Sequence, residues 1–177
     1  MEQTSSEILK GWREFYLLMG TAAATLVGLM FVVASIGAGL FTDAHKDMMK
    51  AFITPTVIHF CVVLFVCLAA LAPSLTSVAL AIVAAAAVLI GIGYSCTAEV
   101  RILKRYVSTT TLGDRLWYAP IPIVGYLTLA AAALSQLVHA SLPDVEWIAF
   151  ALCIILAAGV RNAWAITLWV AVQPRNG

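Results

Sequence analysis

One arginine, Arg161, stands well inside a long apolar run that extends from about Trp147 to Val172. If this run is a helix, a rise of about 1.5 Å per residue places Arg161 roughly 16 Å from the C-terminal end of the run. An arginine at the centre of a membrane-spanning helix costs about 2.5–3.5 kcal/mol on insertion scales. We therefore expect Arg161, with Asn162 beside it, to face other helices or water. Two roles stay open for Arg161: a fixed positive charge on an anion or proton path, or a paired group that locks a helix bundle.

Glu99 is the natural candidate partner for Arg161. It ends a series of residues that recur every four positions and therefore share one helix face. The series is Ala87, Gly91, Ser95 and Glu99. Its first three members form a small-xxx-small stripe, which lets another helix approach closely. A Glu99–Arg161 contact is expected if the third and fifth apolar runs pack together, and the alternative is a Glu99 at the membrane interface that pairs with Arg101 or Lys104.

His59 lies about 12 Å into the second apolar run, counted from the N-terminal end of that run. A histidine at this depth could shuttle protons, and the alternative is a histidine that donates one hydrogen bond to a neighbouring helix. The similar depths of several polar residues predict a cluster in the half of the bundle near the C-terminus. The predicted members are His59, Ser95, Glu99, Arg161 and Asn162.

The first apolar run carries a second small-xxx-small stripe, formed by Gly20, Ala24 and Gly28. Such stripes indicate tight helix packing, either within one chain or between copies. Thr21 and Thr25 on the same run carry hydroxyls of the kind that commonly bond one helix to another.

Catalysis, cofactor binding and nucleic-acid binding find little support in the sequence. Ser135 and His139, with Asp144 following, have the residue types of a hydrolytic triad, but no oxyanion-hole motif accompanies them. The four cysteines lie inside apolar runs without a C-x-x-C pair, so neither zinc nor disulfides are expected. The net charge of +1 gives no electrostatic basis for binding nucleic acid. The sequence therefore predicts a protein that is not an enzyme and has no cofactor.

These polar residues must be positioned by helices in a membrane. Of the 177 residues, 63% are hydrophobic and only 11% are charged, whereas soluble domains carry about 25% charged residues. A spanning helix needs about 20 apolar residues, and five runs without period-2 alternation meet this requirement. The sequence predicts one all-α domain over 1–177, a five-helix transmembrane bundle. Its expected helices are 14–41, 51–72, 75–105, 116–140 and 146–172.

The distribution of basic residues predicts the orientation of the bundle. Cytoplasmic loops carry an excess of Lys and Arg, and one side of the predicted bundle holds most of these residues. They are Lys46, Lys50, Arg101, Lys104, Arg105, Arg115 and Arg175, against Lys10 and Arg13 on the other side. The N-terminus is therefore expected outside and the C-terminus in the cytoplasm. The absence of a targeting segment favours a bacterial cytoplasmic membrane.

Three functional hypotheses follow. The leading one is a homo-oligomeric channel or transporter-like conduit for an ion or small solute, with Arg161 in or near the path. The second is a non-conducting accessory or assembly subunit of a larger membrane complex, in which Arg161 docks to a membrane protein partner or locks the fold. A third, an intramembrane enzyme, depends on Ser135, His139 and Glu99. The lipid bilayer is the expected partner in every case.

Overall fold

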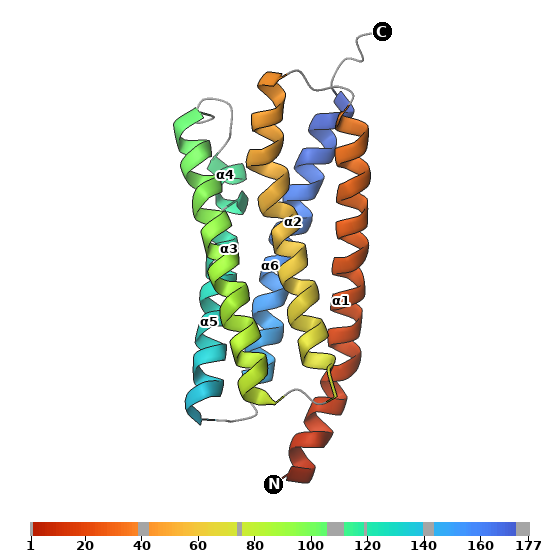
Figure 1. Cartoon of the computed structure of the whole chain (residues 1–177), viewed down its shortest axis with the longest axis vertical. Coiled ribbons are helices and arrows are strands. Elements are labelled where there is room, and N and C mark those ends of the chain that lie inside the picture. The colour runs from red at the N-terminus through yellow and green to blue at the C-terminus, as the bar shows by residue number, and fades with distance from the viewer. Residues whose placement is uncertain are drawn as a thin grey trace.

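The computed structural model describes residues 2–38, 43–73, 76–105, 112–118, 120–139 and 144–172, and these residues form six α-helices joined by short connections (Figure 1). The helices are α1 (Glu2–Ala38), α2 (Asp43–Leu71), α3 (Ser77–Arg105), α4 (Leu112–Tyr118), α5 (Pro120–His139) and α6 (Asp144–Val172). Five segments of these helices are long and apolar enough to cross a membrane. They are Gly11–Ile36, Ile53–Leu71, Ser77–Ala98, Leu116–Val138 and Val145–Leu168. The prediction of an all-α fold with five such segments is confirmed.

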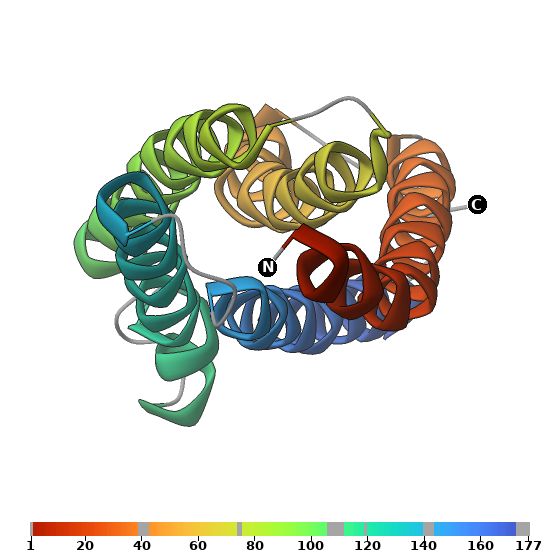
Figure 2. The ribbon, with the colours of Figure 1, turned by 90° about the horizontal axis from the view of Figure 1, so that it is seen from below.

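The long helices run antiparallel in sequence order, so the start of α1 and the end of α6 lie at opposite ends of the bundle (Figure 1). Seen from the N-terminal end, α2 and α6 face each other across the middle, α1 closes one side, and α3 and α5 close the other (Figure 2). All five long helices contribute buried apolar side chains to the core, and α6 contributes the largest share among the described residues. In the following, the two ends of the bundle are called the N-terminal end and the C-terminal end.

The helix bounds differ from the predicted ones at two starts. Helix α1 begins at Glu2 rather than at 14, and its first turns protrude from the N-terminal end of the bundle (Figure 1). Helix α2 begins at Asp43 rather than at 51. The predicted bounds followed the apolar runs, which mark only the part of a helix that suits the hydrocarbon core. The helical backbone hydrogen bonds continue beyond these runs into the charged flanking residues.

The predicted helix 116–140 is divided into α4 and α5. Pro120 and Pro122 explain the division, because a proline has no N–H and disfavours the helical conformation of the residue before it. The carbonyls of Leu116 and Tyr118 consequently lack the donors that a continuous helix would provide four residues later. Pro120 itself is tolerated as the first residue of α5, where an N–H has no partner within the helix.

Glycines allow the helices to approach closely at several points of the core. A Cβ added to Gly159 of α6 would lie 2.6 Å from a ring carbon of Phe60 on α2, and one added to Gly125 of α5 would lie 2.7 Å from Ile155 on α6. Any larger residue at these positions would push the helices apart. By contrast, the hydroxyls of Thr21 and Thr25 donate to the carbonyls four residues earlier in α1. In the single chain these hydroxyls therefore bond to their own helix, and the expectation that they bond a second helix stays a prediction.

Candidate functional site

His59 of α2 and Tyr126 of α5 are joined by a hydrogen bond of 2.8 Å between Nδ1 and Oη. Both side chains are completely buried, and their ring centroids lie 5.6 Å apart. If Nδ1 carries a proton it donates to the tyrosine oxygen, and in the other tautomer the tyrosine hydroxyl donates to Nδ1. In either state the bond joins α2 to α5 through the middle of the bundle.

Gly91 of α3 makes room for the tyrosine ring. A Cβ at this position would overlap the ring and lie 2.5 Å from its hydroxyl oxygen. Ser95, one turn later on the same face of α3, is also completely buried. The face of α3 that seats Tyr126 therefore carries a second polar group next to it.

Five buried polar side chains from four helices form what we call the buried polar layer. They are Thr56, His59, Ser95, Tyr126 and Asn162. At about 1.5 Å per residue, His59 and Tyr126 lie about 18–20 Å from the ends of their helices at the N-terminal end of the bundle. Ser95 and Asn162 lie about 27 Å from that end, one to two turns farther toward the C-terminal end.

Three atoms of the buried polar layer have no hydrogen-bond partner within the described parts of the chain. They are Nε2 of His59, Oγ of Ser95 and Oδ1 of Asn162. A buried polar atom without a partner costs about 1–3 kcal/mol, so three in one region are expensive for a bundle of this size. Each can bind water or a small polar solute: His59 Nε2 and the Ser95 hydroxyl as donor or acceptor, and Asn162 Oδ1 as acceptor.

Asn162 also connects the polar layer to the break between α4 and α5. Its Nδ2 donates to the backbone carbonyl of Trp117, at 3.1 Å. The amide side chain of α6 thus donates to the last turn of α4, next to the two prolines at the start of α5.

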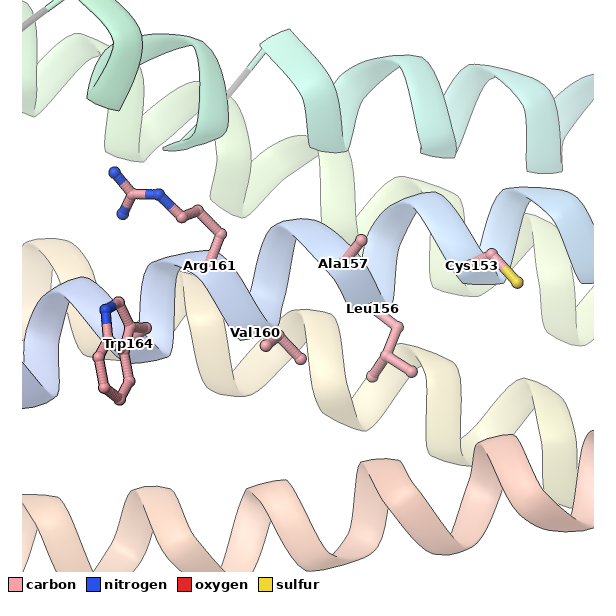
Figure 3. Close-up of a pocket in the computed structure, with 6 residues that line it drawn as sticks. All are labelled: Cys153, Leu156, Ala157, Val160, Arg161 and Trp164. Carbon is pink, nitrogen blue, oxygen red and sulfur yellow. The ribbon is translucent and has the colours of Figure 1, made fainter.

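Arg161 lies beside Asn162 in the sequence, but its side chain takes another direction. It is half-buried and lines an open groove of about 570 Å³ on the outside of α6. Figure 3 shows its guanidinium extending toward α4 and toward the C-terminal end of α6. Successive residues of a helix point about 100° apart, so the inward position of Asn162 directs Arg161 to the flank.

The predicted cluster is therefore only partly brought together. His59, Ser95 and Asn162 all belong to the buried polar layer, whereas Arg161 borders it from the groove. The side chain of Glu99 lies outside the described residues. A Glu99–Arg161 contact was expected if α3 and α6 pack together. Helix α3 instead has its main contacts with α2 and α5, and α6 has its main contacts with α5 and α2. The main packing of the bundle therefore does not meet this condition.

The predicted packing stripes have different environments. Ala87 and Gly91 of α3 are buried, and Gly20 of α1 lies against α2, where an added Cβ would be 3.2 Å from Cβ of Cys67. Ala24 and Gly28 of α1 are exposed on the single chain. A Cβ added to Gly28 would meet nothing within 4 Å. Part of the α1 stripe is thus available to a second copy or to lipid.

Tyr126 is not among the site residues predicted from the sequence, although the sequence contains a signal for it. Tyrosine is enriched at membrane interfaces, and Tyr126 instead stands deep inside an apolar run, directly after Gly125. Such a hydroxyl needs a partner, and His59 is the histidine at a matching distance from the ends of the helices.

The other chemical hypotheses gain no support from the described residues. Among them there is no group of three or more His, Cys, Asp or Glu residues that could hold a metal ion. Ser135 is half-buried, and the side chains of His139 and Asp144 lie outside the described residues. No family model matches the chain, and no curated protein and no solved structure is significantly similar to it.

Proposed function

We propose that the chain is a multi-pass protein of a bacterial cytoplasmic membrane, with its N-terminus outside and its C-terminus in the cytoplasm. The five long apolar segments support membrane insertion, because a hydrocarbon core of about 30 Å requires about 20 residues of helix. The orientation is supported by basic residues of α2, α3 and α4 near the C-terminal end of the bundle. They are Lys46, Lys50, Arg101, Lys104, Arg105 and Arg115.

Within this membrane, the protein acts as a transporter-like conduit for a proton, an ion or a small polar solute. The observation that carries this proposal is the buried polar layer, with its three polar atoms that have no partner among the residues that the structure describes. A bundle that only needed to be stable would fill this region with apolar side chains, since a half-satisfied polar network is worse than an apolar core. A passing proton, ion or solute needs such groups to replace its hydration.

The path is closed toward the outside in this conformation. Between the buried polar layer and the N-terminal end, α2, α5 and α6 contribute fully buried apolar side chains. They are Val63, Val66, Leu129, Ile148 and Leu152. We call these five residues the apolar plug. The plug favours a transporter that opens to one side of the membrane at a time over a permanently open channel. In this proposal Arg161 lies beside the path rather than at its centre.

The conduit works as a homo-oligomer in this proposal. Its support is the pair of small, exposed residues Ala24 and Gly28 on the outside of α1, where a helix of a second copy could approach closely. The second candidate function is a non-conducting accessory subunit of a larger membrane complex. The observation that favours it is the position of Arg161 in a groove on the outside of α6, where a partner could reach it.

Flux measurements in reconstituted liposomes separate the two functions. Proton, cation and anion flux is compared for the wild type, Tyr126→Phe and Ser95→Ala, with protein-free liposomes as the baseline. A conduit gives wild-type flux that both variants lower, whereas Thr128→Val keeps it, because the Thr128 hydroxyl bonds only to its own helix. Folded wild-type protein without flux of any of the three kinds would contradict the conduit and favour the accessory subunit, which should then purify with a second polypeptide.

A further inference from the structure

We propose that the species that passes the conduit is a proton and that His59 carries it. The proposal rests on the transport function proposed above and names its substrate. Water on the cytoplasmic side supplies the proton to the imidazole ring, and water on the other side accepts it after the bundle has changed conformation. One N–H bond of the ring forms and breaks in each cycle.

The unpartnered polar atoms of the buried polar layer are spread along the bundle rather than gathered around one point. His59 lies about 18–20 Å from the N-terminal end, whereas Ser95 and Asn162 lie about 27 Å from it. The described side chains of the layer include no carboxylate and no amine that would balance an ion. An ion sheds its hydration where several ligands converge on it, whereas a proton needs only successive hydrogen-bonding groups joined by water. The staggered arrangement therefore favours a proton over an ion.

The packing around His59 and Tyr126 also disfavours a solute larger than water. Gly91 lies so close to the ring of Tyr126 that an added methyl group would overlap it, and Gly159 lies in the same way against the ring of Phe60. Phe60 follows His59 in α2 and is completely buried. A solute at this depth would have to displace two aromatic rings, whereas a proton requires no space of its own.

The hydroxyl of Tyr126 suits a histidine that changes its protonation state. Histidine is the residue of the layer whose ordinary titration lies near neutral pH. Next to the neutral ring, the hydroxyl can donate to Nδ1 or accept from it. In the charged ring both nitrogens are donors, so the tyrosine oxygen accepts from Nδ1 and Nε2 donates to water. One bond thus orients His59 in both states, and Tyr126 is a positioning residue.

The surroundings of His59 connect proton uptake to a conformational change. The ring is completely buried here, and burial disfavours a charged imidazole, so the carrier is neutral in this conformation. Tyr126 of α5 contacts the ring, and Arg161 of α6 extends toward α4 (Figure 3). On α3 the side chain of Glu99 lies outside the described residues, and α1 has no ionisable residue over 17–38. Uptake therefore belongs to the conformation in which cytoplasmic water reaches the layer.

Flux in proteoliposomes identifies the species. The vesicles contain a fluorescent pH indicator, and a K⁺ gradient with valinomycin sets the membrane potential. We expect the wild type to carry protons at the same rate whether Na⁺ and Cl⁻ are present or replaced by large organic ions. Tracer uptake of Na⁺, Rb⁺ and Cl⁻, measured without valinomycin, should stay at the level of protein-free liposomes.

Two variants separate the proton carrier from its positioning partner. The amide of His59→Asn lies near the place of Nδ1, so it can keep a hydrogen bond to Tyr126, but it takes up no proton. Tyr126→Phe loses the bond and keeps the imidazole. We expect His59→Asn to lower proton flux to the protein-free level, and Tyr126→Phe to lower it but leave it above that level. If only the hydrogen bond mattered, as in a structural role, this order would be reversed.

Several outcomes would overturn the proposal while the conduit stands. They are flux of Na⁺, Rb⁺ or Cl⁻ without proton flux, a folded His59→Asn protein that carries protons at the wild-type rate, and the reversed order of the two variants. If His59→Asn does not fold, His59→Gln is the second variant that takes up no proton, and the wild-type ion comparison still decides the species. Folded wild-type protein without flux of any kind would instead contradict the conduit itself.

Discussion

The hydroxyl of Tyr126 is the most consequential single group in the bundle, because it joins α2 to α5 through His59. Replacing Tyr126 by phenylalanine removes the oxygen and leaves both ring nitrogens of His59 without a partner in the described part of the chain. We expect Tyr126→Phe to lower the free energy of unfolding by about 1–3 kcal/mol. Thermal unfolding in detergent measures the effect, with Thr128→Val as the control that loses only a bond within its own helix. Equal stability of the two variants would contradict the assigned bond.

Gly91 provides a sharper test of the same contact, because Gly93 lies two residues away in the same helix. A methyl group at Gly91 overlaps the ring of Tyr126, whereas one at Gly93 meets nothing within 4 Å. Gly91→Ala should therefore destabilise the protein by about 1–3 kcal/mol, as overpacking does. Gly93→Ala should be neutral or stabilise it by up to about 1 kcal/mol, because alanine favours the helix. The reverse order in thermal unfolding would refute the placement of Tyr126 against α3.

At the scale of elements, the break between α4 and α5 depends on a side chain from α6. Asn162 donates to the carbonyl of Trp117, so Asn162→Ala should loosen α4. Faster amide hydrogen exchange in the peptide that contains 112–118 would show this, with unchanged exchange in α3. Thr167→Ala on the same helix is the control, since the Thr167 hydroxyl bonds to Ala163 of its own helix. Unchanged exchange in α4 would mean that Asn162 is not needed to hold it.

Two glycines of α1 distinguish packing within one chain from packing between copies of the chain. Gly20 lies against α2, whereas Gly28 faces outward with open space around it. Gly28→Leu should therefore leave the unfolding temperature unchanged and lower self-association, measured by the concentration dependence of energy transfer between labelled copies in liposomes. Ala86→Leu, a change on the exposed face of α3, is the control. Unaltered self-association of Gly28→Leu would remove this stripe from the oligomer proposal.

At the scale of the whole molecule, the positions of the helices could be predicted from the sequence better than the directions in which their side chains point. Continuous apolar runs leave the backbone few alternatives to helices, so their number could be anticipated. Depth could also be counted along each run, and His59, Ser95 and Asn162, which this count grouped together, are all buried in the structure. The direction of a side chain depends on which helices are neighbours, and one sequence does not contain that information. Arg161 and Tyr126 show the consequence, since one was expected inside the cluster and the other was overlooked.

The proposed conduit requires that water reach the buried polar layer from the cytoplasmic side and stop at the apolar plug. The most direct test uses Ser95→Cys in a chain whose four native cysteines are replaced. A membrane-impermeant methanethiosulfonate reagent is applied to oriented vesicles from each side, with Leu129→Cys in the plug as the control. The account predicts that Ser95→Cys reacts from the cytoplasmic side alone and Leu129→Cys from neither. A folded Ser95→Cys protein that stays unmodified from both sides, yet reacts fully after denaturation, would contradict it.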